Sequence, residues 1–145
     1  MYKSATLLIL VLTTSALVAG TFALLTIQKD IPGSGSIKGV GVGVYSDSTC
    51  SNPKSSIDFG LLEPGSQKDF TFYLRNEGNT NLSLSMTSNN WDPVEAGDYL
   101  SLTWDREGQQ TYPGQVVSCV LTLSVSENIH DISNYIVTIT ITATG

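Results

Sequence analysis

Short runs of alternating apolar and polar residues fill most of the chain, the pattern of strands with one buried face. After the turn dipeptide Pro64-Gly65, every second residue from Phe70 to Leu74 is apolar. A second alternating run covers 82–86 and follows a polar reversal at 76–79. This arrangement predicts a hairpin in which the second strand folds back on the first.

The same design recurs later in the chain. Pro113-Gly114 precedes a run at 117–125 in which every second residue is apolar. Two strands of like design, each entered by Pro-Gly, predict equivalent places in a two-sheet sandwich. Further alternating runs lie at 37–45, 57–61, 100–104 and 135–143. With seven to nine short strands and no convincing helix after the N-terminal segment, the pattern predicts an all-β, antiparallel sandwich or jelly roll.

Three glycines, Gly39, Gly41 and Gly43, fall on one face of the strand expected at 37–45. Glycine weakens a strand, so three on one face indicate either close approach of another backbone or an exposed, bulged edge strand.

The N-terminal segment is strongly apolar. No charged residue occurs from Ala5 to Ile27, and small residues precede Ala23. The segment 1–23 therefore predicts either a secretory signal peptide cut after Ala23 or a retained membrane anchor. Both alternatives place the remaining chain outside the membrane, secreted or on the cell surface.

The remaining chain divides in two. Residues 24–36 predict an apolar arm followed by a Gly/Ser linker at 32–36, because glycine and serine favour flexible connectors. Residues 37–145 predict the β-sandwich domain.

Composition limits the function. Thirteen acidic residues outnumber seven basic ones, and the formal net charge is −6, which argues against nucleic-acid binding. With a single histidine and no nucleophile in a catalytic setting, we expect no enzyme, no metal site and no cofactor.

Two residue types suggest covalent modification. Cys50 and Cys119 could form a disulfide in an oxidising compartment; alternatively Cys119 is a small core residue and Cys50 a free thiol in a polar loop. The triplet Asn81-Leu82-Ser83 matches the N-glycosylation acceptor pattern.

The order of these parts resembles a known family. The ending Val18–Ala23, the apolar arm, the Gly/Ser connector and the all-β domain are similar to TasA/camelysin proteins and the related archaeal bundling pilins. The segment 58–91 is also similar to archaeal exported β-domain proteins. The resemblance implies a jelly-roll-like subunit of extracellular fibres, in which the N-terminal arm of one subunit inserts as a strand into the next. It assigns the polymerisation arm to Leu24, Leu25, Ile27 and Ile31.

We therefore expect a structural subunit of an extracellular filament, a head-to-tail homopolymer formed by donor-strand exchange. The first alternative is a monomeric adhesion or binding domain that the N-terminal segment anchors to the membrane. The second is a pilin whose N-terminal helix packs in the filament core.

Overall fold

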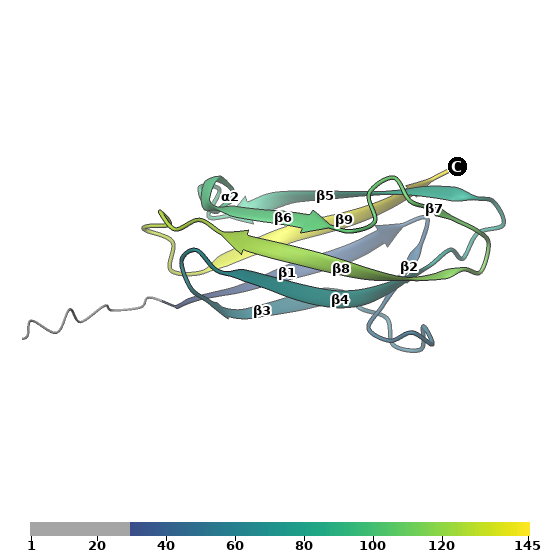
Figure 1. The fold of residues 1–145 in the computed structure, drawn as a ribbon, viewed down its shortest axis with the longest axis horizontal. Coiled ribbons are helices and arrows are strands. Elements are labelled where there is room, and N and C mark those ends of the chain that lie inside the picture. The colour runs from purple at the N-terminus through teal and green to yellow at the C-terminus, as the bar shows by residue number, and fades with distance from the viewer. Residues whose placement is uncertain (1–29) are drawn as a thin grey trace, which may run out of the picture.

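Two β-sheets packed face to face make up the fold of residues 30–145, the part that the computed structural model describes (Figure 1). Sheet A has the strand order β3-β1-β9-β5-β7, and sheet B has the order β2-β4-β8-β6. The elements are β1 (Ile31–Val40), β2 (Gly43–Tyr45), β3 (Ser56–Leu62), β4 (Gln67–Arg75), β5 (Leu82–Asp92), the one-turn helix α2 (Ala96–Tyr99), β6 (Leu100–Trp104), β7 (Gln110–Thr111), β8 (Val116–Val125) and β9 (Tyr135–Thr144). The predicted all-β sandwich and its strand number are confirmed.

The core lies between the inner faces of the two sheets. Strand β8 buries every second residue from Val117 to Val125, and β9 does the same from Tyr135 to Ile141. Each fully buried aliphatic or aromatic side chain contributes about 1.5–3 kcal/mol to folding. In both strands these alternating apolar positions of the sequence are the buried positions of the structure, as the pattern predicts.

Both Pro-Gly turns form as the sequence predicts. Ser66 donates its N–H to the carbonyl of Glu63 at 3.1 Å, and Gln115 donates to Tyr112 at 2.9 Å. The glycines have φ of 76° and 74°, which the turn requires. The two strands of like design that follow these turns, β4 and β8, are direct antiparallel neighbours at the centre of sheet B.

The predicted hairpin does not form. Strand β4 lies in sheet B and β5 in sheet A, so the link 76–81 crosses between the sheets. Asn76, only 1% exposed, holds this crossing. Its side-chain N–H groups donate to the carbonyls of Thr80 (2.8 Å) and Thr111 (3.3 Å), and its oxygen accepts the N–H of Gly78 (2.9 Å). These bonds give the polar groups of the buried Asn76 side chain hydrogen-bond partners where the chain crosses between the sheets.

The single strand expected at 37–45 is split. At Gly41, where φ is 82°, the chain passes from β1 in sheet A to β2 in sheet B. A Cβ at Gly41 would lie 2.7 Å from the carbonyl oxygen of Ala143, and one at Gly39 would overlap the carbonyl of Val42. The close approach of another backbone is therefore confirmed at Gly39 and Gly41, whereas a Cβ at Gly43 would meet the Tyr45 side chain, and the unbroken strand does not form.

The prediction of a flexible linker at 32–36 is wrong. These residues form the first half of β1, which lies between β3 and β9. Its glycines face the core. A Cβ at Gly33 would overlap the Tyr135 ring, and one at Gly35 would lie 3.0 Å from the Phe59 ring. Glycine therefore makes room here for large aromatic side chains. The pairing of β1 with β9 is parallel, which departs from the expected all-antiparallel arrangement.

The expected signal peptide or anchor at 1–23 and the arm residues Leu24, Leu25 and Ile27 lie outside the described residues. Within 30–145, no helix is long and apolar enough to cross a membrane.

Candidate functional site

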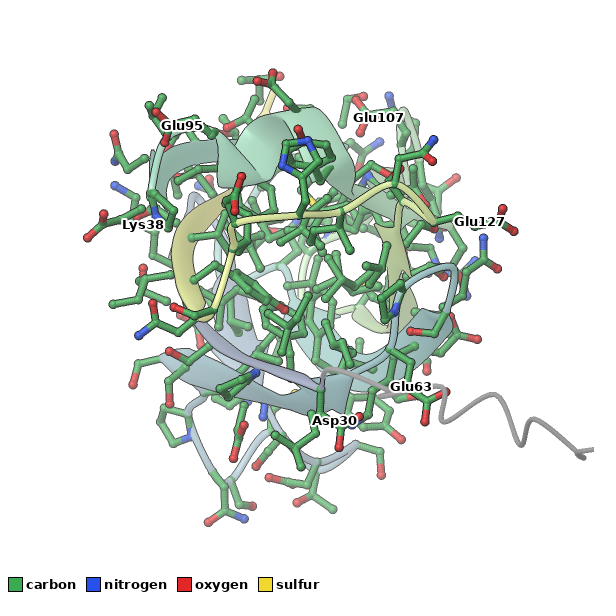
Figure 2. All side chains as sticks on the ribbon, turned by 90° about the vertical axis from the view of Figure 1, so that its left-hand side faces the viewer. Asp30, Lys38, Glu63, Glu95, Glu107 and Glu127 are labelled. Atoms are coloured by element: carbon green, nitrogen blue, oxygen red, sulfur yellow. The ribbon has the colours of Figure 1, made fainter. Side chains whose placement is uncertain are left out.

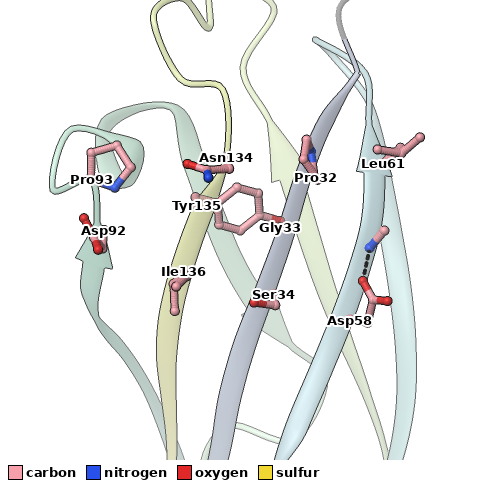
Figure 3. Close-up of a pocket in the computed structure, with 11 residues that line it drawn as sticks. Pro32, Gly33, Ser34, Asp58, Leu61, Asp92, Pro93, Asn134, Tyr135 and Ile136 are labelled. Atoms are coloured by element: carbon pink, nitrogen blue, oxygen red, sulfur yellow. Dashed lines mark hydrogen bonds between the residues drawn. The ribbon is translucent and has the colours of Figure 1, made fainter.

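A shallow trough of about 610 Å³ crosses the outer face of sheet A, at the end where β1 begins (Figure 3). The strand register aligns four side chains across β3, β1, β9 and β5, in the order Asp58, Ser34, Ile136 and Asp92. The full lining consists of Pro32, Gly33, Ser34, Asp58, Gly60, Leu61, Asp92, Pro93, Asn134, Tyr135 and Ile136.

A bulge in β3 builds one wall of the trough. Gly60 has φ of 65°, its N–H donates to the Asp58 carboxylate at 2.8 Å, and the β1–β3 register shifts beside it. The extra residue reverses the alternation of the strand. Leu61 is consequently 62% exposed, whereas Leu62 is buried in the core.

A second irregularity shapes the opposite wall. Near the end of β5 the register against β9 shifts between Asn89 and Asp92, and Asn90 has φ of 52°. The Trp91 ring packs against the core, with its centroid 6.1 Å from that of Tyr135. Ile136, which is 55% exposed, stands between the two walls.

The trough is acidic at both sides. Asp58 and Asp92 are exposed, one at each side of the row. Beneath the row, Tyr135 has a buried hydroxyl that has no hydrogen-bond partner among residues 30–145. Burial, together with the negative charge of Asp58, raises the pKa of Tyr135 well above its usual range. The site therefore suits an apolar or cationic group rather than an anion.

The whole end of the sandwich shares this charge. In the described part of the chain, residue 30 and the links 63–66, 93–99 and 126–134 meet here, and they hold no Lys or Arg. Their acids are Asp30, Glu63, Glu95, Asp98, Glu127 and Asp131. Figure 2 looks at this end and shows four of them, Asp30, Glu63, Glu95 and Glu127.

A smaller hollow of about 320 Å³ adjoins the trough and shares Pro93 with it. The Tyr99 hydroxyl lies 2.8 Å from Nε2 of His130, and Nδ1 of His130 lies 2.9 Å from the Asp131 carboxylate. This exposed chain of hydrogen bonds connects α2 to the link between β8 and β9.

On each open side of the sandwich, one charged side chain hydrogen-bonds a main-chain group. On the β3–β4 side, Lys68 donates to the carbonyl of Phe59 at 2.8 Å. On the β5–β6 side, the Glu107 carboxylate accepts the main-chain N–H of Met86 at 3.1 Å and the indole N–H of Trp104 at 2.7 Å. Charged residues at sheet edges oppose the pairing of a further strand.

The structure places the other predicted site residues apart from the trough or beneath it. Ile31 is 2% exposed and packs in the core of its own chain. Cys50 and Cys119 are both buried as free thiols, so the disulfide is not formed. Burial raises the pKa of Cys119 to about 12. Asn81 is exposed just before β5.

The trough was not predicted from the sequence. The one sequence signal for it is the Asp58-x-Gly60 spacing, which is typical of a bulge.

No group of three or more potential metal ligands occurs within residues 30–145. No family model matches the chain, and no curated protein matches its sequence.

Proposed function

We propose that this chain is an exported structural subunit that polymerises by exchanging its N-terminal strand with the next copy. The position of β1 between β3 and β9, here called the β1 slot, carries the proposal. We call the molecule closed when its own β1 fills the slot, as in this structure. If the β1 of a neighbour fills the slot instead, it makes the same contacts. Exchange of an identical element is for this reason a low-cost route to association.

The corner between β1 and β2 supports this proposal. It consists of only Gly41 and Val42, and short hinges favour exchange over closure. The residues 37–45 alternate as one continuous strand in sequence, yet the closed corner bends them and leaves Val40 50% exposed. Opening the corner would let 37–45 run straight into a neighbouring molecule.

The edges and ends of the sandwich also favour exchange of β1. Lys68 and Glu107 hydrogen-bond main-chain groups on the open sides, which disfavours the addition of a further strand there. The strand β1 begins at one end of the long axis and the C-terminus lies at the other (Figure 1). Head-to-tail exchange between identical copies propagates unless its rotation closes a ring. The uncharged segment from Ala5 to Ile27 supports export.

A double-cysteine variant tests the exchange. The hydroxyl oxygens of Ser36 on β1 and Thr138 on β9 lie 3.5 Å apart, and the two residues are register partners, so cysteines there can form a disulfide. With Ser36→Cys and Thr138→Cys, mild oxidation of the assembled protein should give a covalent ladder on a denaturing gel. The matched control, Ser83→Cys with Thr144→Cys, joins β5 to β9 and should give monomers.

A ladder in the control as well, or monomers only in the test variant, would contradict strand exchange. The second outcome would favour a monomeric domain on the cell surface, a function compatible with β1 pairing inside its own sheet.

A further inference from the structure

The apolar trough lies directly beside the start of β1, since Pro32 belongs to both. Whatever chain supplies β1 therefore delivers the residues that precede it to the rim of the trough. In the sequence these residues are 24–29, Leu-Leu-Thr-Ile-Gln-Lys, followed by Asp30 directly before β1.

The chemistry of this segment complements the trough. Of the six residues 24–29, three are aliphatic and Lys29 is the only charged one, while the acid Asp30 follows outside the segment. The trough offers the half-exposed Leu61 and Ile136, and both of its carboxylates, Asp58 and Asp92, are uncompensated by a neighbouring Lys or Arg in the lining. An aliphatic peptide with one cation fits this surface better than an acidic one.

The dimensions also agree. The row from Asp58 to Asp92 crosses three strand spacings, about 14 Å. Six extended residues reach about 20 Å, so the segment is long enough to cross the trough. Lys29 precedes Pro32 by three residues, and three extended residues span about 10 Å, so the acidic rim is within reach of its side chain.

We infer that residues 24–29 dock in the trough of the sandwich whose β1 slot their own β1 fills. Leu24, Leu25 and Ile27 cover Leu61 and Ile136, and Lys29 lies against the acidic rim. The identity of the donor rests on the proposed function: under strand exchange the segment belongs to the next copy. The docked segment would then hide the apolar trough only when a subunit is joined to its neighbour.

Cross-linking tests the docking with the full-length chain, expressed and assembled. The variant Ile27→Cys with Ile136→Cys is treated with a short bismaleimide, to which the buried native cysteines are poorly accessible. The control pairs Ile27→Cys with Val40→Cys, because Val40 is also half exposed but lies at the far end of β1. We expect a several-fold higher yield for the Ile136 pair.

The charge contact gives a second readout in the same variant. Adding Lys29→Glu should lower the cross-linking yield several-fold, whereas Lys38→Glu, an exposed lysine on β1, should leave it unchanged. Equal yields for the Ile136 and Val40 pairs, or no effect of Lys29→Glu, would overturn the docking.

The products also separate the two proposals. Ladders joined through the Ile136 pair support both the docking and the exchange. Cross-links confined to single chains support the docking and overturn the exchange. Filaments that form without cross-links at Ile136 overturn the docking and leave the exchange standing.

Discussion

Replacing Gly41 with alanine should shift the protein from closed monomers toward polymers. In the closed corner Gly41 has φ of 82°, a conformation that costs an L-residue about 1–2 kcal/mol. The new Cβ would also lie 2.7 Å from the carbonyl oxygen of Ala143, which adds to the penalty. In an exchanged molecule 37–45 is extended, so alanine is tolerated there. A penalty of this size raises the ratio of exchanged to closed molecules about 5- to 30-fold.

Gly108→Ala is the matched control. Its φ is 72° and no atom of residues 30–145 lies within 4 Å of a Cβ built there, so alanine meets the same backbone penalty away from the corner. Closed and exchanged molecules share this penalty, and only the thermal stability should fall.

Sedimentation velocity and negative-stain microscopy at matched protein concentrations measure the shift. The Gly41 variant should contain a larger polymer fraction than both the native protein and the Gly108 variant. If Gly41→Ala lowers the melting temperature but leaves the polymer fraction equal to that of Gly108→Ala, the corner is not a hinge and the reasoning is refuted.

Further predictions concern the core, the edges and one loop. Tyr135→Phe removes a buried hydroxyl without a partner in the described part of the chain, so the free energy of unfolding should stay constant or rise by about 1 kcal/mol in urea titrations; a clear loss would reveal a partner. Asn76→Ala breaks the three hydrogen bonds of a buried side chain and should lower the free energy of unfolding by about 2 kcal/mol or more; a loss under half of that would contradict its role at the crossing. Lys68→Met frees the carbonyl of Phe59 and should increase light scattering from lateral association relative to Lys38→Met, while equal scattering would exclude an edge role. Hydrogen bonds from Thr49, Ser51 and Asn52 hold the pKa of Asp47 well below its ordinary value, so this loop's contribution to stability is complete above about pH 4 and is lost as the pH falls further. Asp47→Asn should therefore flatten the acid limb of the stability curve, and an unchanged limb would contradict this assignment.

Local signals in the sequence predicted local structure. The alternation of β8 and β9 and the two Pro-Gly turns depend on residues a few positions apart, and all of them form as expected. The sheet partner of a strand is not local information. The hairpin prediction failed because Asn76 bonds the carbonyl of Thr111, 35 residues away, and the chain crosses to the other sheet.

The supposed linker failed for a related reason. Composition alone cannot distinguish a flexible Gly/Ser segment from a strand whose glycines face large side chains. Gly33 accommodates Tyr135, which lies about a hundred residues further along the chain. The trough escaped prediction because the bulge at Gly60 turns Leu61 outward, and a bulge shows only as a subtle break in alternation.

The central claim, that each β1 slot is filled by the next copy, is most directly tested by a cryo-electron microscopy map of fibres assembled from the native chain. Strand exchange predicts continuous density from β2 through an extended 41–42 into the sheet A of an adjacent subunit. Density that turns at Gly41 and returns β1 to its own sandwich would contradict it.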